Sequence, residues 1–503
     1  MFSTTSKTPL VLKLVLVLFF PSLLLSQSPE ILDISKRCSV AELRKNLYYL
    51  ADAKLEGRMM GTKGDTLSAQ YVGIWFKMNG LKEPYRNGNS FMQGIEAKRI
   101  INNSNLEFGG IQYPLYDGWS LYPNITNSIS KLPVLCFGAM PFDSILRTQG
   151  DYLRGNAILV DGIVMLTAIR TGVIDSIEAV LTNRGVKAVI FADSVVHRIV
   201  AQMKERLFLP KYQVDLPGET PNGGMPEISI TPEMLSKLVL PDNLPVNASG
   251  RFTDTTQRSA VKLKSPISVN ISETIQTVMA PNVIGVIPGS DTTLDVIVVG
   301  AHRDHDGKNG SDIYHGAVDN ASGTVAIMQI ASMMNEAVKK GFRPKRTIVF
   351  NSYTGEERGL LGSGWYVNHP LHAMNQTHAM LNLDMLGRVD TSYSGKKADS
   401  NYVYYQVSDS LDHGLSKAMQ KASATMPGLK LDPHYQEPPY RRRMLTGSDH
   451  YNFYLKGVPV IAFTCGFPPE YHKPDDTADK ISYELLKQQT QLAFLTLWNL
   501  AND

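Results

Sequence analysis

Cysteine is scarce in this chain: Cys38, Cys136 and Cys465 are the only three in 503 residues. An odd number of widely separated cysteines defines no disulfide framework, so at most one pair can form. None of the three has the sequence spacing of a metal-ligand cluster. Any metal bound by this chain must therefore be held by histidine and carboxylate side chains.

An excess of charge of either sign is also missing. Fifty lysines and arginines nearly balance 47 aspartates and glutamates, and the net charge of +3, without a long basic tract, gives no reason to expect nucleic acid as a partner. One short basic cluster, residues 441–443, is predicted to be a solvated loop, and contact with the anionic end of a substrate is the alternative. The composition, 43% hydrophobic and 19% charged, is that of an ordinary globular protein and excludes disordered and fibrous classes.

Long hydrophobic runs are absent, and the longest apolar stretch lies near the N-terminus. Lys7 and Lys13 precede twelve uncharged residues, 14–25, which contain Pro21 and fall short of the ~18–20 residues that cross a bilayer. Basic residues, a short apolar core and a small residue at its end are typical of a secretory signal peptide, here residues 1–26. An uncleaved signal anchor is the alternative. We expect an exported protein, secreted or periplasmic, with no membrane span after signal removal.

The length of the chain and a change in its local secondary-structure pattern indicate two domains. A chain of 503 residues exceeds a single core of ordinary size. Short strand and turn signals begin near residue 109, and the segment up to residue 264 contains no cluster of histidines and carboxylates. We predict that residues 109–264 form an inserted, smaller β-rich domain between residues 27–108 and 265–503 of the main domain.

Two helices are expected before the insertion. Residues 39–57 place apolar side chains at helical spacing, with Ser39 as the N-cap and Glu42 three residues later, the pattern of a capping box. A second helix is expected from about residue 65, ended by Asn79 and Gly80.

Strand and helix signals alternate in long units from residue 281 onward. Apolar strands are expected at residues 282–289, 294–302, 346–354, 378–386, 402–408 and 458–465, with helices at 322–339, 359–367, 409–424 and from 482. Strands that are apolar throughout and alternate with amphipathic helices are typical of a parallel sheet covered on both faces. The predicted fold class is therefore α/β, with a mostly parallel, doubly covered mixed sheet.

Side chains of the metal-binding type follow these strands one after another. They are His302, Asp319 before a helix, the pair Glu356 and Glu357, Asp384, and His472. Ligands of an open parallel sheet gather at the carboxyl ends of its strands, so these residues are expected to converge. Two histidines and three carboxylates suit Zn²⁺ or a related divalent ion, and two ions that share one carboxylate would use all five. One of the adjacent glutamates would then be left to accept a proton from water.

Six motifs in this order resemble those of the co-catalytic zinc metallopeptidases, the family of zinc aminopeptidases and glutamate carboxypeptidases. They are VGAHRDH, GAVDNASG, YTGEERGLLGS, NLDMLG, SDHYNF and YHKPDDT. The upstream stretch LADAKLEGRMMGTKG is similar to the opening of this family, and the inserted section resembles a protease-associated domain. The resemblance implies a zinc-exopeptidase fold of the phosphorylase/hydrolase-like type.

The resemblance also implies roles for individual residues. Two Zn²⁺ ions per chain are expected, other divalent metals being possible. His302 and Asp384 would complete one site, Glu357 and His472 the other, and Asp319 would bridge both ions. Glu356 would be the general base.

Other residues near the motifs receive weaker expectations. Asp304 would orient His302, and Tyr471 would stabilise the oxyanion, with packing as its alternative. His450 is expected to be a pocket-wall or structural histidine. The remaining histidines and aspartates of this region are expected to lie on a turn-rich surface loop without a metal role: His305, Asp306 and His315.

These features together predict an exported di-zinc exopeptidase that acts on peptides or proteins. An aminopeptidase using a metal-bound hydroxide is favoured, because acidic residues around the metals can bind a free α-ammonium group. A carboxypeptidase of the same family, a single-zinc glutaminyl cyclase and a non-catalytic receptor-like relative are the alternatives. The complete ligand set argues against the last of these. The sequence carries no indication of the oligomeric state.

Overall fold

The computed structural model describes residues 28–122, 128–147, 150–171, 173–192, 209–216, 225–254, 259–390, 401–408 and 414–503. The predicted signal peptide, residues 1–26, lies outside the described residues. None of the helices in the described ranges has both the length and the apolar composition that a membrane span requires.

A nine-stranded mixed sheet forms the centre of the larger lobe. Its order is β20 (Lys430–Asp432), β19 (Tyr402–Val407), β21 (Val460–Thr464), β18 (Thr377–Leu383), β14 (Val296–His302), β17 (Ile348–Tyr353), β13 (Glu273–Ile287), β1 (Met92–Asn102) and β9 (Lys211–Gln213). The four consecutive strands β21, β18, β14 and β17 are parallel to one another. Antiparallel pairs flank them on both sides. The predicted α/β mixed sheet is confirmed, with its parallel part at the centre.

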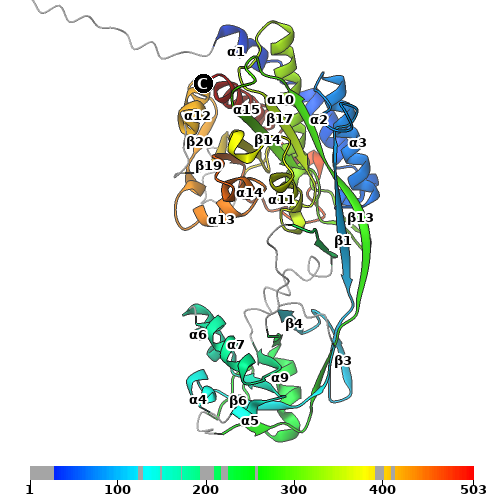
Figure 1. Cartoon of the computed structure of the whole chain (residues 1–503), viewed down its shortest axis with the longest axis vertical. Coiled ribbons are helices and arrows are strands. Elements are labelled where there is room, and N and C mark those ends of the chain that lie inside the picture. The colour runs from blue at the N-terminus through cyan, green and yellow to red at the C-terminus, as the bar shows by residue number, and fades with distance from the viewer. Residues whose placement is uncertain are drawn as a thin grey trace, which may run out of the picture.

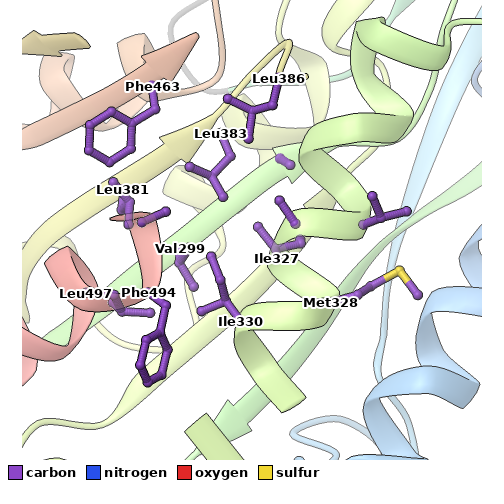
Figure 2. Close-up of a cluster of buried hydrophobic side chains, with 14 of the residues drawn as sticks. Val299, Ile327, Met328, Ile330, Leu381, Leu383, Leu386, Phe463, Phe494 and Leu497 are labelled. Atoms are coloured by element: carbon purple, nitrogen blue, oxygen red, sulfur yellow. The ribbon is translucent and has the colours of Figure 1, made fainter. Parts of the chain in front are cut away.

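Helices cover both faces of this sheet. One face packs against α1 (Pro29–Ser35), α2 (Val40–Leu50), α3 (Lys63–Met78), α10 (Ser322–Lys339), α12 (Leu415–Ser423) and α15 (Tyr483–Asn502). The other face packs against α11 (Leu361–Asn368) and α14 (His450–Leu455). Neighbouring residues of β14 belong to opposite faces, since Val299 joins the first cluster and Val298 the second. Figure 2 shows side chains of β14 and β18, among them Val299 and Leu381, packed against Ile330 of α10.

Capping chemistry sets several of the predicted helix ends, although α2 ends at Leu50 and does not continue to residue 57 as predicted. The Ser39 hydroxyl accepts a hydrogen bond from the Glu42 amide at 3.2 Å and caps α2. Helix α3 ends at Met78, where Asn79 is the C-cap and Gly80 follows with a φ of +76° that glycine adopts without strain. Helix α10 spans the predicted residues 322–339.

A second lobe is built from residues between β1 and β13. One sheet has the order β11 (Val261–Lys262), β6 (Val134–Gly138), β7 (Ala157–Val160), β8 (Ala188–Ala192), β10 (Glu227–Ile230) and β4 (Trp119–Tyr122). Another has the order β3 (Ile111–Pro114), β2 (Asn105–Phe108), β12 (Ile267–Asn270) and β5 (Ile129–Leu132). The described helices of this lobe are α4 (Phe142–Leu146), α5 (Gly150–Leu153), α6 (Gly162–Arg170), α7 (Ile174–Asn183) and α9 (Pro232–Val239).

The second lobe has its own apolar clusters and stands apart from the main sheet. Figure 1 shows the long strands β1 and β13 running side by side between the two lobes. These strands pair along eleven residues, from Met92 opposite Val283 to Asn102 opposite Glu273. Strand β9, which lies within the segment assigned to the insertion, pairs with β1 at the edge of the main sheet. The domain limits at residues 109 and 264 stay a prediction.

Candidate metal centre

The predicted ligands lie at the ends of adjacent parallel strands. His302 is the last residue of β14, Asp384 directly follows β18, and Glu357 lies in the turn after β17. His472 follows β21 through a loop, and Asp319 lies in the irregular turn that leads into α10. The sheet order brings these strand ends together, as the sequence predicts.

The Asp319 carboxylate lies between two imidazoles. Its Oδ1 is 3.4 Å from Nε2 of His302, and its Oδ2 is 2.9 Å from Nε2 of His472. The Nε2 of His302 is also 3.2 Å from Oδ1 of Asp384. The Nε2 of His472 is 3.7 Å from Oε2 of Glu357. The Nε2 of each histidine thus meets one oxygen of Asp319 and at least one further carboxylate.

The chemistry of this donor set fits divalent metal ions. Three overlapping groups have ligand atoms close enough to share an ion: His302 with Glu356 and Asp384, His305 with Asp319 and Glu357, and Asp306 with Glu357 and His472. Five of these side chains are carboxylates crowded into a buried volume. Burial of several like charges is unfavourable unless cations neutralise them. Nitrogen and oxygen donors without cysteine are the ligands of zinc and related ions.

The pKa shifts of Glu356 and His472 reflect the same crowding of carboxylates. Burial, reinforced by the charges of Glu357 and Asp384, raises the pKa of Glu356 well above its usual value, although His302 opposes that shift. Burial opposes protonation of His472, yet Glu357, Asp306 and Asp319 raise its pKa to about 10. The cluster therefore attracts positive charge strongly, whether protons or metal ions carry it.

Comparison with known proteins relates the C-terminal part of the chain to one peptidase family. The profile of peptidase family M28 matches residues 282–497, a segment that contains every ligand named above. Residues 282–497 are therefore similar to peptidase family M28, and this segment is called the M28 domain below.

Curated relatives resemble the M28 domain over part of their length. The mouse protein "Aminopeptidase NAALADL1" is 32% identical over 123 residues, 24% of this chain and 16% of the relative. "Probable glutamate carboxypeptidase LAMP1" of Arabidopsis thaliana is 36% identical over 122 residues, 24% of this chain and 17% of the relative. "Probable leucine aminopeptidase" of Arthroderma otae is 30% identical over 227 residues, 44% of this chain and 58% of the relative. The matches thus span less than two thirds of these relatives.

Solved structures match almost the whole chain in fold. An aminopeptidase from Aneurinibacillus sp. strain AM-1 superimposes with a TM-score of 0.56 at 18% identity, covering 94% of this chain and 96% of that one. BSAP, a zinc aminopeptidase from Bacillus subtilis, gives a TM-score of 0.53 at 20% identity, covering 92% and 95%. At these identities the likeness concerns the fold, and it extends over both lobes.

Two residues of the M28 domain that were expected on the surface lie inside the centre. His305 and Asp306 are both fully buried. The Nδ1 of His305 is 2.7 Å from Oε1 of Glu357, and the Nδ1 of His472 is 3.1 Å from Oδ2 of Asp306. The surface prediction was wrong for these two residues, because the chain turns outward only at β15 (Gly307–Asn309), where residues 308–312 reach the surface.

Asp304 connects two parts of the site. Its main-chain carbonyl lies 3.2 Å from Nδ1 of His302, whereas its carboxylate Oδ1 is 3.9 Å from the same nitrogen. The carboxylate accepts a hydrogen bond from the main-chain amide of Glu356 at 3.2 Å. Burial raises the pKa of Asp304 to about 6. The role of this residue in orienting His302 stays a prediction.

The other residues singled out from the sequence divide into two groups. Tyr471 and His450 line the same cavity as the ligands. The ring of Tyr471 lies 3.8 Å from that of His472, and burial lowers the pKa of His450 to about 4, so its imidazole is neutral. His315 instead faces the carbonyl of Ala51, with its Nδ1 at 2.8 Å.

Buried residues that the sequence analysis did not single out hold the ligand turns in place. The Asp476 carboxylate accepts hydrogen bonds from the amides of Val318 and Asp319 at 2.9 and 3.1 Å. Arg58, fully buried, donates to the carbonyls of His315 and Gly316 at 2.8 and 2.9 Å. Asp476 lies in the motif YHKPDDT and Arg58 in the stretch LADAKLEGRMMGTKG, and these motifs were the sequence signal that could have identified both residues. They fix the main chain that presents Asp319.

Backbone conformation near the ligands is unusual in the same way at three places. His472, Met385 and Leu360 have φ values of 54°, 62° and 57°, in the left-handed region that residues other than glycine seldom adopt. Each such conformation costs about 1 kcal/mol or more, and the surrounding structure must maintain it. Met385 directly follows Asp384, so two of the three positions belong to or adjoin a candidate ligand.

Proposed function

We propose that this protein is a zinc-dependent exopeptidase, and that it is an aminopeptidase that removes N-terminal residues from peptides. The observation that carries the proposal is the Asp319 carboxylate, whose two oxygens separately face His302 and His472. A carboxylate in this position can bridge two ions. The similarity of the M28 domain to its peptidase family and the zinc aminopeptidase among the structural neighbours support the choice of zinc and of a peptidase reaction.

The residues that would hold the ions form two sets with one shared member. One set is His302, Asp384 and Asp319, and the other is Glu357, His472 and Asp319. Bound ions supply Lewis-acid polarisation of the scissile carbonyl and lower the pKa of a water molecule. Two ions per chain, rather than one, is the arrangement that uses all five side chains.

Glu356 is the proton carrier in this proposal. Its Oε2 lies 3.9 Å from Nε2 of His302, and its side chain is only 11% exposed. The raised pKa that follows from burial brings its proton affinity closer to what a general base at neutral pH needs. Glu356 takes a proton from the attacking water as oxygen bonds to the carbonyl carbon. It then gives this proton to the leaving amine as the carbon–nitrogen bond breaks.

The cavity favours action at the amino end of a peptide. The cavity has a volume of about 150 Å³ and is lined by the carboxylates of Asp319, Glu356 and Asp384, and carboxylates bind an α-ammonium group. Tyr471 would donate its hydroxyl to the oxyanion that forms on the carbonyl. A carboxypeptidase remains the second candidate, because similar relatives carry both names.

Two measurements test the proposal together. Aminoacyl p-nitroanilides should be hydrolysed, while peptides with a blocked amino end should not; cleavage of the blocked peptides alone would favour a carboxypeptidase. A chelator should abolish hydrolysis, and zinc or cobalt should restore it. Metal analysis should give two ions per active chain, whereas one zinc and cyclase activity on N-terminal glutamine would favour the glutaminyl cyclase alternative.

A further inference from the structure

One wall of the cavity is aromatic and carries a single cation. The phenylalanine and tyrosine residues that line the cavity are Tyr405, Tyr435, Phe463, Phe467 and Tyr471. Among the described residues that line this cavity, Arg443 is the sole lysine or arginine. The cluster of three arginines noticed in the sequence thus contributes one member to the site, on the short helix α13 (Arg441–Thr446).

A continuous series of ring contacts leads from the metal ligands to Arg443. The ring of His472 lies 3.8 Å from that of Tyr471, which lies 5.2 Å from Phe467. The guanidinium carbon of Arg443 lies 4.7 Å above the centroid of Phe467. Stacking on an aromatic face holds a guanidinium in place and leaves its N–H groups directed outward from its edge.

No described carboxylate forms an ion pair with Arg443, in contrast to other arginines of this domain. Arg303 pairs with Asp65, Arg358 with Asp306, and Arg388 with Glu470. A cation in a cavity wall that has no carboxylate partner among the residues described is available to a ligand. Its planar fork of N–H groups matches the two oxygens of a carboxylate.

We propose that Arg443 forms a carboxylate-binding subsite, so that preferred substrates carry a carboxylate close to the scissile bond. This inference rests on the proposed exopeptidase function and narrows its substrate class. The carboxylate has two possible sources, the acidic side chain of an N-terminal residue or the free C-terminus of a dipeptide. The chemistry of recognition is the same for both, and substrate pairs distinguish them.

The first experiment compares substrates that differ only in that charge. Glutamyl and glutaminyl p-nitroanilides form the side-chain pair, and leucyl-leucine with its C-terminal amide forms the terminal pair. In the wild-type protein one pair should show about a tenfold preference in kcat/KM for the carboxylate, expressed mainly in KM. In Arg443→Met this preference should fall to about one, and Arg443→Lys should retain part of it, since lysine keeps the charge without the fork.

Arg442 supplies a matched control. It is exposed on the same helix and does not line the cavity. Arg442→Met removes the same charge from the same surface, so it should keep the wild-type preference. A preference near one for both pairs in the wild type, or one that survives in Arg443→Met, overturns the subsite. Equal loss in Arg442→Met and Arg443→Met also overturns it, because a diffuse surface potential then accounts for the effect.

A binding measurement separates this subsite from the peptidase reaction. Calorimetry compares glutamic acid α-amide with glutamine amide, and leucine with leucinamide, on the metal-loaded protein. One carboxylate ligand should bind about tenfold more tightly than its neutral counterpart, and only Arg443 variants should lose the difference. If no peptide is hydrolysed but this difference persists, the proposed function fails and the subsite stands. If peptides are hydrolysed but no difference in binding or preference is seen, the subsite fails alone.

Discussion

At the scale of single residues, Glu356 and Glu357 are neighbours in sequence with different surroundings. Glu357 places one oxygen 2.7 Å from His305 and the other 3.7 Å from His472. Glu356 instead faces His302 at 3.9 Å. The two side chains therefore diverge toward separate partners, and substitution should separate their roles.

Glutamine at each position gives the first prediction. Glu356→Gln should retain bound metal and lower kcat by about 10²–10⁴-fold, because a positioned proton acceptor is lost. Glu357→Gln should lose metal, because an amide is a poorer ligand than a carboxylate. Metal content after dialysis and kcat on leucine p-nitroanilide check both variants. The opposite pattern would exchange the two roles.

Asp306 gives a second prediction at this scale. Its carboxylate meets Nδ1 of His472 at 3.1 Å and the guanidinium of Arg358 at 2.9 Å. A carboxylate behind a metal-bound imidazole orients the ring and raises its basicity, and loss of such a partner weakens metal binding about 10–100-fold. Asp306→Asn should show this loss in a competition titration with a chelator. Asp312→Asn, on the exposed part of the same loop, is the control and should bind metal like the wild type.

Residue type and strand position were sufficient to predict that the five candidate ligands lie close together. His302, Asp384 and Glu357 could be placed because each follows an apolar strand closely. His305 and Asp306 could not, because glycine and asparagine follow them and the whole stretch reads as a turn. Burial of that stretch depends on packing against residues 52 and 166 positions further along the chain, which local pattern does not contain.

At the scale of elements, the short strand β9 joins the second lobe's segment to the larger lobe. Tyr212 of β9 is 9% exposed and donates its hydroxyl to the carbonyl of Met60 at 2.7 Å. Met60 in turn packs so closely on Gly355 that an added Cβ would lie 2.6 Å from its sulfur. Gly355 immediately precedes Glu356. The strand therefore supports the turn that carries both glutamates.

Substitution of Tyr212 tests this support. Tyr212→Phe should reduce the free energy of unfolding by about 1 kcal/mol through loss of one buried hydrogen bond. Tyr212→Ala should reduce it by about 3 kcal/mol or more, because a large buried side chain is removed. Urea denaturation measures both changes. Tyr152→Phe, at a tyrosine that is 45% exposed, should leave stability unaltered, and equal effects at both sites would contradict the assigned support.

Elements with a strong periodic pattern were predicted well. The long two-stranded ribbon formed by β1 and β13 was not predicted. Helix α10 and strands β14 and β21 are apolar and bounded by turn residues. The first half of β13 is mostly exposed or half-buried, and its residues lack the apolar run that marks a buried strand. Its extended form depends on pairing with β1, a partner distant in sequence. Pairing of this kind is invisible to a local reading.

At the scale of the whole molecule, the second lobe is joined to the M28 domain through paired strands. Joining residue 102 to residue 273 by a two-residue turn would remove the lobe together with β9. The shortened protein should still bind metal and hydrolyse small aminoacyl amides, since every candidate ligand lies in residues 282–497. Loss of β9 exposes apolar residues including Ile95 and Ala280, which should lower the free energy of unfolding by roughly 3 kcal/mol or more. A soluble, metal-loaded product without activity on any small amide would contradict this.

The ribbon also bears on the order in which the protein folds. Asn102 and Glu273 face each other across it, so the chain between them, apart from the short strand β9, is one very long excursion from the main sheet. Closing a flexible loop becomes harder with length, by about 0.6 kcal/mol for each doubling. A second lobe that collapses first, around its own apolar clusters, brings these two residues together and shortens the effective loop. Early assembly of the accessory lobe would then speed the pairing of β1 with β13, although none of the candidate ligands named above lies in that lobe.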